Sequence, residues 1–184
     1  AQASFCDGRR IIRVRMTPEV TVSALADVEM GMSLAERGYV VRGLDGGLFV
    51  DIHLGGAATA RAFTLEEPGR IVIDLQPGGQ PVETAPDHND TMVVTTPRPG
   101  DATNDPISIA GYARTRDGQV NVTGSMGRAV HVESSTNAAA WVDTWGEFML
   151  QLRVGDLGPL ELSVGSAATG DTGGDQVTLE VEVR

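Results

Sequence analysis

The stretch Thr91–Thr123, TMVVTTPRPGDATNDPISIAGYARTRDGQVNVT, decides the fold of this chain. It predicts three short strands joined by turns that are rich in Pro, Gly and Asp. In the central strand, Ile107 and Ile109 share one face with Gly111, while Tyr112 lies on the other face, because side chains alternate along an extended segment. The two prolines between the first and second strands exclude a helix there, since each removes a backbone N–H donor.

Composition and charge exclude several classes of protein. The 184 residues allow one large β domain or two small ones. The formal charge is −11: residues 1–78 hold 8 Arg against 10 acids, a net −2, and residues 79–184 hold 6 Arg against 15 acids, a net −9. Such a field repels a phosphate backbone, so we expect no nucleic-acid partner. No run approaches the ~20 apolar residues of a membrane span, so no transmembrane segment is expected in this chain.

The first half of the chain reads as a series of short strands. Alternating apolar residues predict strands at 9–16, 39–42, 48–54, 60–65 and 70–75. The last of these, RIVIDL, is predicted to be the most strongly buried strand of this half. The segment 21–28 stays ambiguous, because Val22, Leu25 and Val28 recur at helical spacing whereas the apolar residues after Val28 alternate like a strand.

A change of composition predicts a domain boundary after this half. The segment 76–90, QPGGQPVETAPDHND, holds three prolines and two glycines and few apolar residues, as linkers do. We therefore expect an all-β chain with one β-sandwich at 1–78, a linker at 79–90 and a second β-sandwich at 91–184. Seven evenly spaced strands make the second domain immunoglobulin-like: 92–95, 107–114, 119–124, 129–134, 147–154, 160–164 and 176–183.

Motifs in the second half resemble a known family. Thr96-Pro97-Arg98-Pro99-Gly100-Asp101, then Pro106-Ile107 to Gly111-Tyr112-Ala113, and then Trp145-Gly146-Glu147-Phe148 follow one another in the order of the Gmad2 family. This family is the immunoglobulin-like domain of bacterial spore-germination and sporulation proteins. The resemblance covers roughly 91–184 and implies that Trp145 and Phe148 anchor the sandwich. The chain departs from the family at 115–118, where an aromatic-acidic pair is common.

The first half resembles an AMIN-like domain, a non-catalytic module of bacterial envelope proteins. The residues that carry this resemblance are Ala62-Phe63-Thr64-Leu65 and the run from Pro68 to Leu75, PGRIVIDL. The resemblance implies a secreted or envelope-bound bacterial protein whose first domain binds cell-wall glycan or an envelope partner. Neither family brings catalytic residues with it.

Three arginines form the first candidate binding site. Arg13 and Arg15 share the polar face of the first long strand, and Arg42 ends another strand of the same half. A row of guanidinium groups suits two-pronged contact with carboxylates, such as those of peptidoglycan stem peptides. The alternative is a solvated strand face balanced by neighbouring acids. In either case we expect replacement of Arg13 and Arg15 by Ala to cost only about 0–1 kcal/mol of stability.

Trp141 is the second candidate, and metal sites are not expected. An exposed Trp141 would offer a stacking platform for a sugar, although it also fits an ordinary loop position. Two Asp-rich turns, 101–105 and 171–175, could give oxygen ligands to calcium or simply stabilise the turns. The histidines lack ligand-like spacing to one another or to the lone Cys6, so no zinc and no cofactor are expected. His53 and His131 are expected at half-exposed strand positions, and His88 lies in the linker.

The sequence thus predicts a non-enzymatic protein, extracellular or in the cell envelope. Two functions are open: binding of cell-wall glycan through the first domain, or a scaffold role in which the immunoglobulin-like domain docks a protein by edge-strand pairing or through its loops. An enzyme ranks last, because no acid–base pair or nucleophile set converges in the sequence.

Overall fold

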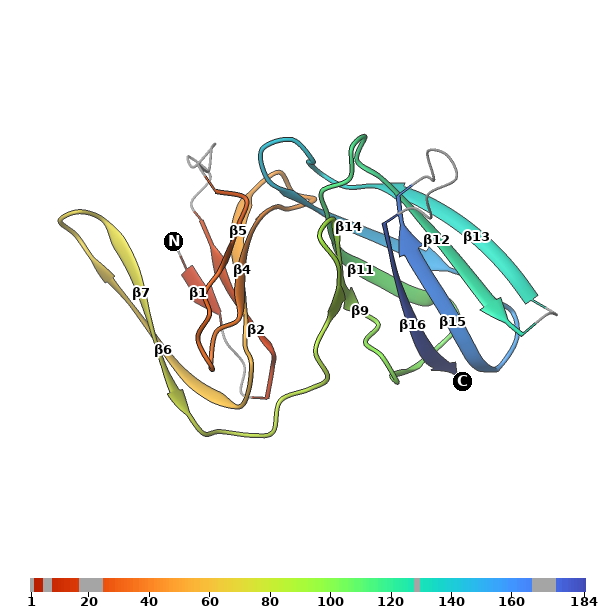
Figure 1. The fold of residues 1–184 in the computed structure, drawn as a ribbon, viewed down its shortest axis with the longest axis horizontal. Helices are drawn as coiled ribbons and strands as arrows, with labels where there is room; N and C mark the ends of the chain where they lie inside the picture. The colour runs from red at the N-terminus through yellow and green to blue at the C-terminus, as the bar shows by residue number, and fades with distance from the viewer. Residues whose placement is uncertain (1, 5–7, 17–24, 128–129, 167–174) are drawn as a thin grey trace. The chain divides into compact units, whose positions relative to one another are not determined.

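The chain is built from β-strands that form two compact units. The computed structural model describes residues 2–4, 8–16, 25–127, 130–166 and 175–184, and within them it contains strands and no helix. The first unit comprises 1–41 and 47–84, and the second comprises 42–46 and 85–184. The prediction of an all-β chain of sandwich type is confirmed (Figure 1).

In the larger sheet of the first unit, the order of the strands differs from their order in the sequence. Its strands lie in the order β1, β2, β5, β4, with β3 also paired to β4. Their bounds are β1 Gln2–Ser4, β2 Ile11–Arg15, β3 Asp27–Glu29, β4 Arg37–Arg42 and β5 Leu48–His53. Of the ambiguous segment 21–28, residues 21–24 lie outside the described residues, and 27–28 are in β3.

A β-hairpin covers one face of this sheet. Strands β6 (Ala58–Leu65) and β7 (Arg70–Pro77) pair only with each other and form a separate ribbon, drawn in yellow in Figure 1. Ile12 and Val14 of β2 make a small core with Leu54 and Ala58. Further apolar residues of the sheet and the hairpin pack against this core: Met16, Leu34, Val50, Ile52, Ala60, Ile71, Ile73 and Leu75.

The hairpin corrects the prediction that RIVIDL is the most buried strand of this half. No residue of β7 is fully buried. Ile71, Ile73 and Leu75 turn toward the small core, whereas Val72 and Asp74 lie on the opposite face, which no other strand covers. An apolar run of this kind is typical of strands covered on both faces, but the two-stranded ribbon has only one covered face.

The segment predicted as a linker makes specific hydrogen bonds. The Glu83 amide donates to the Gly8 carbonyl, and the Glu83 carboxylate accepts from the Arg10 amide (3.2 Å). Further on, Asp87 and His88 form β8, which pairs with β9 (Met92–Thr96). The segment therefore contributes to both units, one after the other, and the boundary that we predict from composition remains to be tested by proteolysis.

The second unit is a sandwich of two sheets. One contains β14, β11, β9 and β8 in that order, and the other contains β10, β16, β15, β12 and β13. The bounds are β8 Asp87–His88, β9 Met92–Thr96, β10 Ala102–Thr103, β11 Ile107–Ala113, β12 Gln119–Met126, β13 Val130–Asn137, β14 Trp145–Leu152, β15 Gly158–Gly165 and β16 Gln176–Val183.

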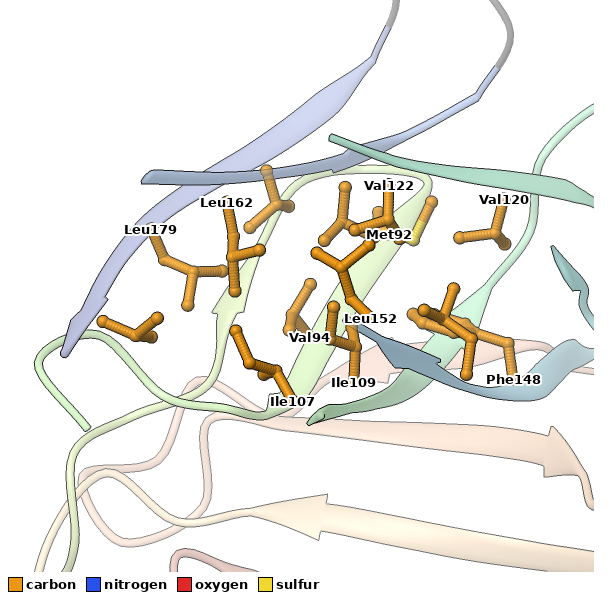
Figure 2. Packing of buried hydrophobic residues seen from close by; sticks show 14 of the residues in the cluster. Met92, Val94, Ile107, Ile109, Val120, Val122, Phe148, Leu152, Leu162 and Leu179 are labelled. Atoms are coloured by element: carbon orange, nitrogen blue, oxygen red, sulfur yellow. The ribbon is translucent and has the colours of Figure 1, made fainter. Parts of the chain in front are cut away.

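The core of the sandwich is aliphatic, with Phe148 as its one large aromatic side chain among the described residues. Ile107 and Ile109 of β11 face inward, as their alternation predicts, and Figure 2 shows them opposite side chains of the second sheet such as Leu162 and Leu179. Each buried Val, Leu or Ile contributes roughly 1.5–3 kcal/mol, so this core is the main source of stability in the unit.

At two glycines of this unit, the main chain of a neighbouring segment lies too close to leave room for a Cβ atom. A Cβ atom on Gly111 would lie 2.0 Å from the carbonyl oxygen of Val93, and one on Gly146 would lie 2.1 Å from that of Ala140. The pairing of β11 with β9 also shifts register at Ala110–Gly111. Both glycines belong to the motifs that carry the family resemblance, and their role there is steric.

Candidate functional site

Arg13 forms an ion pair with an acid of the neighbouring strand, as the alternative interpretation of this face expects, and its side chain stays 28 % exposed. Because β2 and β5 pair with Arg13 opposite Asp51, the guanidinium makes two hydrogen bonds to this carboxylate, Nε to Oδ1 at 2.8 Å and Nη2 to Oδ2 at 2.7 Å. Asp51 is fully buried, and the guanidinium carbon of Arg13 lies 3.8 Å from the centre of the Phe49 ring. The charge of Arg13 therefore balances that of Asp51, and we now expect the removal of this side chain to cost more than the roughly 0–1 kcal/mol of an exposed charge.

Further aromatic contacts lie along β4 and β5. The rings of Tyr39 and His53 lie 4.8 Å apart, and Arg37 sits over Tyr39 while it forms an ion pair with Asp27. His53 is 8 % exposed, so the expectation of a half-exposed histidine is wrong here; His131 is exposed and contacts Glu133. Burial raises the pKa of Tyr39 to about 12, which keeps its hydroxyl protonated at neutral pH.

Arg15 shares the face of β2 that carries Arg13, two residues further along, and it is exposed at the end of the strand. Arg42 ends β4 and belongs to the second unit. Arg42 donates from Nη1 to the Gly46 carbonyl (3.0 Å) across the turn that follows β4. The proposed row of arginines for carboxylate binding stays a prediction, with Arg15 as its most accessible member.

The two tryptophans have different environments. Trp145 is 1 % exposed and packs edge-on against Tyr112, with ring centres 6.3 Å apart. It lies on the outer face of β14, opposite the core face that carries Phe148, so only Phe148 anchors the space between the sheets. Trp141 is 40 % exposed, and its ring lies so close to Gly118 that a Cβ there would be 2.4 Å from Cε3. One face of the Trp141 ring is thereby supported by the 115–118 turn.

In the acidic turn 101–105, the carboxylates accept hydrogen bonds from backbone amides of the chain itself. Asp101 accepts a hydrogen bond from the Arg98 amide, and Asp105 accepts from the amides of Val154 and Gly155. The contact of Asp101 is the local one by which Asp stabilises turns, whereas that of Asp105 ties the turn to the segment after β14. Asp171 lies outside the described residues, and within the part that is described no group of three His, Cys, Asp or Glu side chains is arranged to hold a metal.

A long free sheet edge is the feature that the sequence did not locate. Among the described strands, β13 ends its sheet beside β12, whereas β10 at the opposite end has two residues. An edge strand presents unpaired N–H and C=O groups, and proteins usually protect it with Pro, Lys or a bulge. β13, with the sequence VHVESSTN, contains neither Pro nor Lys, and it pairs with β12 in a regular register. No local signal in the sequence tells which strand ends a sheet.

The outer face of this sheet is polar and acidic. Glu133 on β13 points outward, beside Thr123 on β12, and its side chain is 70 % exposed. Further exposed acids of the same sheet are Glu161 on β15 and Glu180 and Glu182 on β16, two and three strands away from β13. An extended segment that paired with β13 would therefore lie next to Glu133 first.

The comparisons with known proteins agree with the fold of the second unit. Residues 91–174 match the family model described as the immunoglobulin-like domain of bacterial spore germination, which confirms this part of the resemblance. No curated protein and no solved structure matches the chain. The AMIN-like interpretation of 1–78 remains a prediction. No helix among the described residues is long and apolar enough to cross a membrane.

Proposed function

We propose that this chain is a non-catalytic binding protein of the bacterial cell envelope, in which the germination-type immunoglobulin-like domain docks a protein partner by strand addition at β13. The observation that carries the proposal is the position of the eight-residue strand β13 at the end of its sheet, where no described strand pairs with its outer edge. Strand addition gives affinity through main-chain hydrogen bonds and specificity through alternate side chains. The AMIN-like motif in β6 and β7 supports an envelope location for the whole chain.

The partner segment is expected to be extended and basic. Glu133 projects on the outer face of β13 with its side chain 70 % exposed, so a segment paired with this edge would lie beside its carboxylate. A segment with Arg or Lys at alternate positions would place its charges over this face, which would speed association and reject acidic strands.

Charge reversal on β13 tests this proposal. The immobilised full chain is incubated with solubilised envelope proteins, and we expect Glu133→Lys to lose the basic partner that the wild-type protein retains. Asp156→Lys, in the exposed loop after β14, changes the net charge equally and should retain it. Amide hydrogen exchange should then show protection of β13 in the complex, because a paired strand shields its amides. Equal retention by both variants, or no protection at β13, rejects strand addition there.

Wall glycan binding is a second candidate, and the placement of Trp141 favours it. The ring is supported on one side by Gly118 and is 40 % exposed, which suits stacking against a sugar. If the chain binds glycan in this way, it should co-sediment with purified sacculi, and Trp141→Ala should reduce the bound fraction several-fold. Val142→Ala, an exposed apolar neighbour, serves as the control. Absence of the wild-type protein from the pellet removes this candidate.

A further inference from the structure

Strand β7 presents a second free edge, in the first unit. Within the described residues its hairpin has two strands and no further neighbour. Two-stranded ribbons are marginally stable in water and usually need additional strands or a covering layer. The outer face of the hairpin carries apolar side chains near its tip, with Phe63 38 % and Leu65 41 % exposed and Val72 opposite Phe63.

An open hollow of about 630 Å³ lies beside the same strand. Residues 73–76 of β7 line one side of it, and 32–35 line the other. The hollow therefore leaves room for a further strand beside Ile73 and Asp74 of β7.

We infer that the occupant is β7 of a second copy of this chain, paired antiparallel about a twofold axis at Val72. In this register Val72 meets Val72 of the second copy, and Arg70 of each copy lies directly opposite Asp74 of the other. Opposite charges in direct cross-strand positions stabilise a pair of strands, so the register brings two favourable pairs. The contact is isologous and closed, as dimer interfaces usually are.

Other registers of the same pairing are less favourable. A one-residue slip would place Val72 opposite Ile73, which lies on the core face, so outer and core faces would be mixed. A centre at Asp74 or at Arg70 would set like charges against each other, and a centre at Ile71 or Ile73 would set Val72 against a charged residue. The alternation of charged and apolar residues along β7 thus selects Val72.

The side chains of β6 complete the pattern. Its register places Phe63 beside Val72, Arg61 beside Asp74 and Leu65 beside Arg70. The paired hairpins would form a four-stranded sheet with an apolar central row, Phe63 and Val72 from each copy. Flanking rows would place Asp74 between two arginines, Arg61 of its own copy and Arg70 of the other. On the core face, Ile71 of each copy would lie beside Ile73 of the other.

Charge reversal and its rescue test the inference in the full chain. By sedimentation at up to about 100 µM, where protomer concentration controls assembly, we expect a species of twice the 19.3 kDa chain. Asp74→Arg should weaken the dimer at least tenfold, as should Arg70→Asp. The double variant should recover much of the lost affinity, because the pairs between the copies are re-formed with their charges exchanged while the new arginine lies beside Arg61 of its own hairpin. Glu66→Arg in the hairpin turn changes the net charge as Asp74→Arg does and should leave the dimer intact.

Cross-linking fixes the register independently of these charges. In a Cys6→Ser background, Val72→Cys should form an intermolecular disulfide under mild oxidation, because directly paired residues have Cα atoms about 4.5–5.5 Å apart, within disulfide reach. Leu65→Cys, on the outer face of β6, should not. A monomeric wild-type protein overturns the inference. So does a dimer that Asp74→Arg leaves unchanged, that the double variant does not restore in large part, or that Val72→Cys does not cross-link.

Discussion

Replacing Gly111 by Ala is expected to unfold the immunoglobulin-like domain or to lower its stability by about 3 kcal/mol or more, the upper end of overpacking effects. The new methyl carbon would lie 2.0 Å from the carbonyl oxygen of Val93 and 3.0 Å from Cζ of Phe148. The first is main chain in a paired strand, so it cannot move aside without breaking the β9–β11 ladder. At about 4–8 °C per kcal/mol for a domain of this size, the thermal midpoint should fall by more than 10 °C.

Calorimetry of the full chain measures this effect, with matched glycine controls. Gly56→Ala should change the midpoint by less than a few degrees, because nothing lies within 4 Å of its Cβ position and its backbone is not left-handed. Gly146→Ala should resemble Gly111→Ala, since its Cβ would meet Ala140 main chain at 2.1 Å. A Gly111→Ala protein that melts like the Gly56→Ala protein would show that β9 and β11 do not pack as described.

The parts of the fold that the sequence predicts well are those with one covered face. Strict alternation identified β16 at 176–183 with its observed bounds, and the two faces of β11 agree with the prediction. A sandwich buries one face of each strand, so the twofold period of the side chains appears directly in the sequence. The same logic could have placed Trp145: it lies three residues before Phe148, and an odd spacing in a strand puts two side chains on opposite faces.

Sheet order and partner strands are not visible in the sequence. The free edge of β13 depends on which strands the loops bring next to β12, and β7 appears buried until its sheet is known to have only two strands. The candidate site shows the same limit. Arg13 sits among alternating residues like any solvated arginine, and its partner Asp51 is 38 residues further along the chain. Only the register of β2 with β5 brings them together.

Replacing Arg13 by Ala is accordingly expected to destabilise the first unit by about 3 kcal/mol, the scale measured when one member of a buried ion pair is removed. The substitution leaves the Asp51 carboxylate fully buried without its two charge-assisted hydrogen bonds, and it uncovers the Phe49 ring. Arg15→Ala, two residues further along the same strand, is the matched control and should cost about 0–1 kcal/mol, as exposed charges do. Urea denaturation of the full chain, followed through the transition of the first unit, gives both values.

A second substitution separates loss of the ion pair from loss of packing. If the loss of the Arg13 charge beside the buried Asp51 carboxylate dominates the cost, Asp51→Asn in the Arg13→Ala background should recover part of the lost stability, because a neutral amide is less costly to bury than a carboxylate. If the cost comes from the uncovered Phe49 ring, the double variant should be no more stable than Arg13→Ala alone. If Arg13→Ala and Arg15→Ala both cost little stability, Arg13 behaves as an exposed side chain. It then stays a candidate for the wall-binding surface.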